Sequence, residues 1–186
     1  MSAFFRPRPR AVAPAARRLA AGVALALGLL AFGSAVLAQS FQSQAPFAVL
    51  LDSETGAVLY EKAADELMVP ASMAKLATVL VAFQDITAGR LSLDSEISIS
   101  ENAWRKGGAP SGGSAMFAII NSRIKLSDIL QGIIVQSGND ASIALAEAIA
   151  GDEPTFGRIM TERVRGLGLT KSVFRNATGM PDPQQR

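Results

Sequence analysis

Apolar residues near the start of the folded region fall into two short β-rich runs. Residues 47–51 (Phe-Ala-Val-Leu-Leu) and 57–60 (Ala-Val-Leu-Tyr) flank a turn-like stretch, Asp-Ser-Glu-Thr-Gly, at residues 52–56. This pattern predicts an antiparallel hairpin. Residues 91–100 alternate loosely between apolar and polar positions, so a short strand or extended segment is expected there.

Longer apolar runs indicate helices. The run from Ser72 to Phe83 follows Pro70 and is stopped by Gly89, and only three of its twelve residues are polar. A helix that is apolar on nearly every side belongs in a core. Three further helices are expected over residues 127–134, 141–150 and 155–167.

Turns and loops are expected between these helices. Ser127 and Asp128 are placed to cap the first of the three later helices, and a turn at residues 138–140 separates it from the second. Residues 107–114, Gly-Gly-Ala-Pro-Ser-Gly-Gly-Ser, predict a flexible loop. Residues 172–174 are expected to be extended before a proline-containing loop.

The first 38 residues have the pattern of a secretory signal peptide. Residues 19–38 are uncharged and rich in Ala, Leu and Val, follow an arginine-rich start, and end in small and apolar residues before Gln39. Cleavage would leave a short linker, residues 39–45. A retained membrane anchor is the alternative, because about 20 apolar residues can span a bilayer. The pair Arg17-Arg18 leaves the twin-arginine export route undecided.

Charge and composition exclude several functions. Five of the 18 basic residues and no acidic residue precede Ala38, so 13 basic residues remain against 16 acidic ones. No basic cluster of the kind that binds nucleic acid follows. The chain contains no cysteine and no histidine. Thiol catalysis, disulfides and a Ser-His-Asp triad are therefore excluded within this chain, and a zinc site would have only carboxylates as ligands.

Ser72 and Lys75 are the first candidates for chemistry. Their three-residue spacing places a hydroxyl and an amine on one face of a first helical turn. Serine needs an adjacent base to act as a nucleophile, and burial or a helix N-terminus would keep a lysine partly neutral by lowering its pKa. Alternatively, Ser72 caps the helix and Lys75 extends to solvent.

Ser137 and Asn139 are the second pair of candidates. They lie in the turn between two apolar helices, where a hydroxyl and an amide can relay a proton or hold a substrate carbonyl. They are also ordinary turn formers. An exported chain without His or Cys that carries both Ser-x-x-Lys and Ser-Gly-Asn is far more specific than either motif alone.

These motifs resemble those of low-molecular-mass D-Ala-D-Ala carboxypeptidases, the penicillin-binding enzymes of peptidase family S11. The resemblance includes the hairpin and extends over about residues 46–179. Its quoted segments are residues 70–78 (Pro-Ala-Ser-Met-Ala-Lys-Leu-Ala-Thr), 126–130 (Leu-Ser-Asp-Ile-Leu), 136–141 (Gln-Ser-Gly-Asn-Asp-Ala), 166–169 (Gly-Leu-Gly-Leu) and 176–179 (Asn-Ala-Thr-Gly).

The resemblance implies a fold and a reaction. The fold would be an α/β (α+β) domain of the β-lactamase/transpeptidase type, a helical cluster packed on an antiparallel sheet, with its N-terminal part in residues 46–186. Ser72 would attack the bond between the last two D-alanines of a peptidoglycan stem peptide. Lys75 would accept the Ser72 proton, Ser137 would help protonate the leaving amine, and Asn139 would bind substrate or orient Lys75.

The same resemblance implies partners, location and cofactors. The protein would act in the periplasm, either free or associated with the membrane if its N-terminal segment is retained, and β-lactams would acylate Ser72. No cofactor, metal or nucleic acid is expected, and the oligomeric state is left open. Gly138 replaces the Asp of the Ser-Asp-Asn motif of class A β-lactamases, which favours the carboxypeptidase.

The third motif of the family is absent. Lys-Thr-Gly does not occur in the chain, and residues 171–173, Lys-Ser-Val, lack its glycine and follow the second motif too soon. The chain is therefore expected to be a truncated product or a fragment. The alternatives to a carboxypeptidase are an inactive wall-binding remnant, a relative of class A β-lactamases, or a plain structural domain.

Overall fold

The computed structural model describes residues 41–186. The expected signal peptide and the first residues of the expected linker lie outside the described residues. Within residues 41–186, no helix is both long and apolar enough to cross a membrane.

The predicted hairpin is confirmed. Strands β1 (Ala48–Leu51) and β2 (Val58–Lys62) pair antiparallel, with Ala48 opposite Lys62 and an irregularity between Leu50 and Leu51. The turn is organised by Asp52, whose carboxylate accepts hydrogen bonds from the amide and the hydroxyl of Thr55, each at 2.7 Å. A short polar side chain that bonds to the backbone ahead of it is what the turn-like composition predicted.

The helix predicted from Ser72 is present but begins later. A single 3-10 turn, η1 (Ala71–Met73), carries Ser72, and the α-helix α2 (Ala74–Thr87) follows it. The expected burial on all sides is wrong for the described residues. Leu76 is 76% exposed and Phe83 is 47% exposed, so α2 buries one face and leaves a second apolar face accessible.

The three later helices are confirmed, with shifted ends. They are α4 (Leu126–Gln136), α5 (Asn139–Ala150) and α6 (Glu153–Arg165). The expected Ser127-Asp128 cap is wrong, because α4 already begins at Leu126 and has no side-chain cap. Helix α6 does have a side-chain cap, since Asp152 accepts from the Thr155 amide at 2.6 Å.

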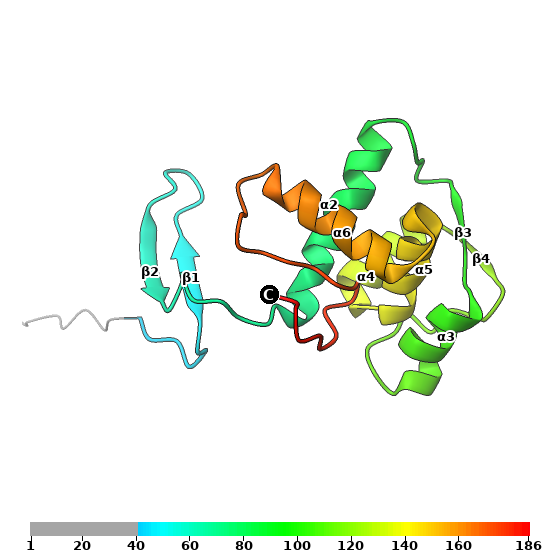
Figure 1. Ribbon diagram of the computed structural model, residues 1–186, viewed down its shortest axis with the longest axis horizontal. Helices are drawn as coiled ribbons and strands as arrows, with labels where there is room; N and C mark the ends of the chain where they lie inside the picture. Colours follow the sequence, from blue (N-terminus) through cyan, green and yellow to red (C-terminus); the bar gives the residue numbers. More distant parts are fainter. Residues whose placement is uncertain (1–40) are drawn as a thin grey trace, which may run out of the picture. The chain divides into compact units, whose positions relative to one another are not determined.

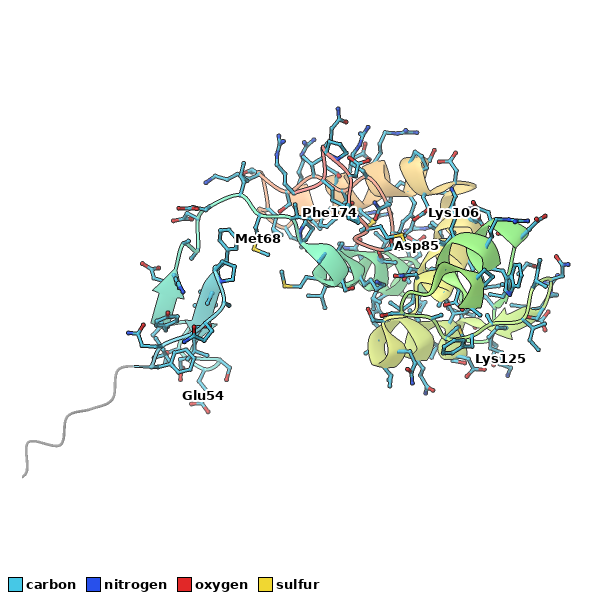
Figure 2. The ribbon with its side chains drawn as sticks, turned by 90° about the horizontal axis from the view of Figure 1, so that it is seen from below. Glu54, Met68, Asp85, Lys106, Lys125 and Phe174 are labelled. Atoms are coloured by element: carbon cyan, nitrogen blue, oxygen red, sulfur yellow. The ribbon has the colours of Figure 1, made fainter. Side chains whose placement is uncertain are left out.

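Helix α5 is the centre of the packing. Its residues 139–146 are all buried, and it contacts α2, α4 and α6 (Figure 1). Asp85 of α2 adds a polar tie to α6, since its carboxylate pairs with Arg90 and lies 3.5 Å from Arg163. Figure 2 shows Asp85 among the packed helices, whereas Lys125 lies at the edge of this group of helices.

Two elements were not predicted. Helix α3 (Glu101–Gly107) begins after Ser100, whose hydroxyl caps it, and strand β4 (Arg123–Lys125) pairs antiparallel with β3 (Glu96–Ser98). The segment expected as one loop from residue 107 instead contains the end of α3 and a 3-10 turn, η2 (Ala109–Ser111).

Gly107 explains how closely α3 packs on α5. A Cβ at Gly107 would lie 2.4 Å from the backbone nitrogen of Asp140 and 2.5 Å from the carbonyl carbon of Asn139. Only a residue without a side chain permits this backbone contact. The approach fixes the first turn of α5, which follows Ser137 and Gly138.

Asp140 ties the same turn to the segment before β4. Its fully buried carboxylate accepts hydrogen bonds from the amides of Met116 (2.9 Å), Ala118 (3.0 Å) and Ala141 (2.9 Å). Buried amides are costly when they have no acceptor. Asp140 therefore holds residues 116–118 beside the Ser-Gly-Asn turn.

We expect Asp140→Ala to lower the free energy of unfolding by about 3 kcal/mol, because buried amides would lose their acceptor at about 1–3 kcal/mol each. Urea unfolding followed by circular dichroism measures the change. Asp65→Ala is the matched control, since Asp65 is exposed and its substitution should leave stability nearly unchanged. Equal stability of the two variants would contradict the assignment.

Candidate active site

Ser72 is presented by the turn before α2. The turn starts after Pro70, whose carbonyl accepts from the Met73 amide at 3.1 Å, and Ala71 has a left-handed backbone (φ 47°). A positive φ is rare for a residue with a side chain and marks a locally constrained site. Ser72 is exposed, so its hydroxyl is accessible to a ligand.

Lys75 lies one helical turn further and is buried. Its Nζ is 3.4 Å from the Ser72 Oγ and 2.8 Å from the backbone oxygen of Thr178. The residue is only 5% exposed, and this burial lowers the pKa of the Lys75 amine. The first contact is long, as hydrogen bonds of catalytic pairs often are before substrate binds.

The two alternative readings of this pair are wrong. Neither η1 nor α2 has a side-chain cap, so Ser72 does not cap the helix. Lys75 does not extend to solvent but donates to a buried carbonyl.

A pocket of about 300 Å³ opens at this pair. Its polar side chains are Ser72, Lys75 and Ser137, and its remaining lining is aliphatic: Leu76, Val79, Ile133 and Ile134. The structure therefore brings residues from α2 and from the end of α4 to one cavity. Apolar walls with a few convergent polar groups are typical of small-ligand sites.

The Ser-Gly-Asn turn is tightly packed at its glycine. Ser137 ends α4 in a left-handed conformation (φ 53°), and the Gly138 amide donates a hydrogen bond to the Gly132 carbonyl at 2.9 Å. A Cβ on Gly138 would lie 3.0 Å from the Met116 amide nitrogen and 3.1 Å from an Asp140 oxygen. Close packing on both sides thus fixes where Ser137 points.

Asn139 is near this pocket but does not line it. It is the first residue of α5, is 8% exposed, and its backbone amide donates to the Ser114 carbonyl at 2.9 Å. Its Nδ2 faces Gly113, at 3.3 Å from the place a Cβ there would occupy. Of the four candidates, three share the cavity and Asn139 sits against the glycine-rich segment.

Residues 176–179 are part of the resemblance, but the sequence alone assigned residues 176–180 no role in the site. Their Thr178 carbonyl is the hydrogen-bond acceptor of Lys75, although 103 positions separate the two residues. The Asn-x-x-Gly spacing of Asn176 and Gly179 is a turn signature that could have drawn attention to this loop.

The arrangement can support nucleophilic catalysis. A hydroxyl lies beside an amine whose neutral form is favoured by burial, and a second hydroxyl shares their cavity. Lys171, from the segment set aside as a substitute third motif, is exposed and does not line this cavity. Among residues 41–186, no group of three or more metal-binding side chains is placed to hold an ion.

Curated proteins that are similar to this chain are named D-alanyl-D-alanine carboxypeptidases. The D-alanyl-D-alanine carboxypeptidase DacF of Bacillus subtilis is 33% identical over 173 residues, which cover 89% of this chain and 43% of DacF. The chain thus spans less than half the length of this relative.

Solved structures of penicillin-binding proteins are similar to this chain in fold. Penicillin binding protein 5 from Haemophilus influenzae has a TM-score of 0.72 at 34% identity, over 78% of this chain and 42% of that one. Penicillin-binding protein D2 from Listeria monocytogenes, in its ampicillin bound form, has a TM-score of 0.63 at 25% identity, over 75% of this chain and 54% of that one. The penicillin-binding, transpeptidase-like fold expected from the motifs is confirmed.

The family expectation is confirmed as well. Residues 34–186 match the peptidase S11 family model, described as D-alanyl-D-alanine carboxypeptidase. The chain therefore belongs to the S11 family of D-alanyl-D-alanine carboxypeptidases.

Proposed function

We propose that the whole protein hydrolyses the terminal D-Ala-D-Ala bond of peptidoglycan stem peptides through an acyl-enzyme on Ser72. The observation that carries this proposal is the Ser72 hydroxyl beside the buried Lys75 amine in a cavity that Ser137 also lines. Membership of the S11 family and the carboxypeptidase name of its Bacillus relative support the substrate class.

The first half of the reaction forms the ester. The Ser72 oxygen attacks the carbonyl carbon of the penultimate D-alanine, and its proton passes to the lone pair of Lys75 Nζ. Ser137 then helps to return a proton to the nitrogen of the terminal D-alanine, so the C–N bond breaks and D-alanine leaves. Asn139 binds the substrate or orients Lys75.

The second half releases the shortened peptide. A water molecule loses a proton to the amine and attacks the ester carbon, and Ser72 leaves with a proton. A β-lactam should acylate Ser72 by the same first half, with its leaving nitrogen still attached through the opened ring. The ampicillin bound form of the Listeria neighbour supports β-lactam binding by a related fold.

We further propose how the chain is organised and where it acts. Residues 1–38 serve as the export signal, residues 39–45 as a linker, and residues 46–186 as the N-terminal part of the catalytic domain. The protein acts in the periplasm on the cell wall, with membrane association if residues 1–38 are retained.

We expect the protein isolated from its own cell envelope to release D-alanine from a synthetic peptide ending in D-Ala-D-Ala. Ser72→Ala should reduce this rate by about 10³-fold or more, because it removes the nucleophile. Chromatography of the released amino acid measures it. Ser53→Ala, in the hairpin turn, is the matched control and should retain the wild-type rate. Full activity in Ser72→Ala would refute the proposal.

The rate of β-lactam acylation should depend on pH through Lys75. Only the neutral amine accepts the Ser72 proton, and burial lowers the Lys75 pKa from its ordinary value of 10.5. The rate should therefore rise with pH along one titration and level off below pH 10.5. Stopped-flow acylation, corrected for spontaneous β-lactam hydrolysis, gives the profile. A profile that is flat, or still rising above the ordinary lysine pKa, would exclude Lys75 as the base.

A further inference from the structure

The loop of residues 176–180, here called the brace loop, runs along the active-site end of α2. The Ala177 carbonyl accepts from the Thr78 Oγ1 at 2.8 Å, and the next carbonyl, of Thr178, accepts from Lys75 Nζ at 2.8 Å. Two successive backbone carbonyls therefore bond to two side chains one turn apart on the same helix.

The next residue of the brace loop touches the nucleophile's turn. Gly179 has a left-handed backbone (φ 81°), and a Cβ there would lie 1.7 Å from the Ala71 oxygen and 3.1 Å from the Ser72 nitrogen. No side chain fits in this space. The brace loop thus contacts the base and the segment that carries the nucleophile at consecutive residues.

One side chain closes this loop. The Asn176 Oδ1 accepts from the Thr178 amide (3.2 Å), the Thr178 hydroxyl (3.1 Å) and the Gly179 amide (2.8 Å). Its Nδ2 donates to the Met180 carbonyl at 3.0 Å. Both the oxygen and the nitrogen of the Asn176 side chain therefore bond within the loop. None of these hydrogen bonds is made to Ser72 or Lys75.

Buried and half-buried side chains outside the brace loop also bond to it or to the segment before it. The Gln185 side chain accepts from the Asn176 amide (3.2 Å) and donates to the Met180 carbonyl (3.2 Å). The Glu153 carboxylate accepts from the Ala177 amide at 3.2 Å. Phe174, labelled in Figure 2, anchors the preceding segment, with its amide bonded to the Thr161 hydroxyl at 2.9 Å.

We propose that Asn176 is a positioning residue for acylation, which holds the Thr178 carbonyl on Lys75 so that the amine keeps its lone pair for the Ser72 proton. The proposal rests on the function proposed above. One N–H of the neutral amine is fixed by the carbonyl. When the Ser72 O–H bond breaks, its electron pair forms the bond to the substrate carbon and its proton goes to Nζ, whose bond to the carbonyl then becomes charge-assisted.

Several charged residues of α2 and of the helices packed on it have partners other than Lys75. Asp85 on its own helix pairs with Arg90 and Arg163, Asp140 bonds to backbone amides, Glu147 to Asn102, and Glu153 to Ala177. The other charged residues of the helices packed on α2 are Asp128, Arg158, Glu162 and Arg165. Burial is the cause of the lowered Lys75 pKa, and the brace loop contributes the carbonyl that contacts the buried amine.

The first test measures the Lys75 pKa without any need for activity. Mass spectrometry measures how fast the Lys75 amine reacts with an amine-selective acylating reagent at each pH. In Asn176→Ala we expect the pKa to rise toward its ordinary value, because the water that replaces the released loop solvates the ammonium more strongly than the single carbonyl does. Asn176→Ser retains an oxygen that can accept from the same amides, so a smaller rise is expected.

Asn102→Ala is the matched control, because it also removes one asparagine side chain and its hydrogen bond, to Glu147 at 2.8 Å, far along the chain from the brace loop. It should leave the Lys75 pKa unchanged. An unchanged pKa in Asn176→Ala would overturn the proposal, even if that variant is less stable in urea. If Asn176→Ala fails to fold, the same comparison is made with Asn176→Ser, and an unchanged pKa there overturns it equally.

Penicillin acylation separates this proposal from the function on which it rests. With both correct, Asn176→Ala acylates about 10-fold or more slowly at neutral pH and recovers as the pH rises toward 10.5, the ordinary lysine pKa. A shifted Lys75 pKa without acylation of the wild type would refute the function and keep the positioning role. Normal acylation by Asn176→Ala with an unshifted pKa would refute only the positioning role.

Discussion

The hydrogen bond from Lys75 Nζ to the Thr178 carbonyl is the interaction on which the site depends. The Lys75 amine is buried, and among the described residues its hydrogen-bond acceptors are neutral oxygens and no carboxylate. Loss of hydration therefore disfavours the charged amine, and no negative charge beside it offsets this effect. A carbonyl steadies a neutral amine without imposing the charged form as a carboxylate would. The result is a lysine suited to accept a proton from a hydroxyl 3.4 Å away.

Close backbone contacts make this burial possible. Gly179 lies against the turn of Ser72, Gly138 lies against the Met116 amide, and Gly107 lies against the start of α5. A side chain would collide with backbone at Gly179 and Gly107 and would be tightly placed at Gly138, and each glycine adjoins a candidate site residue. The helices are thus spaced by glycines where the site is built, and by Ala, Ile, Leu and Phe side chains elsewhere in the core.

Local patterns predicted much of this arrangement. The hairpin, α2, α4, α5 and α6 follow from apolar periodicity and turn residues, and the Ser72–Lys75 pairing follows from helical geometry. Helix α3 was missed because it is only seven residues long and has little apolar periodicity. The role of the brace loop in the site was missed for another reason. Its hydrogen bonds to α2 join residues about 100 positions apart, and no local sequence pattern encodes such contacts.

The proposed transfer of the Ser72 proton to Lys75 is tested most directly by locating the penicillin adduct. The protein is treated with penicillin, digested and mapped by mass spectrometry, beside Lys75→Arg, whose guanidinium keeps its proton at all accessible pH values. The account predicts one penicilloyl group on the peptide that contains Ser72, lost in Lys75→Arg. An adduct on another residue, or equal labelling of Ser72 in Lys75→Arg, would contradict it.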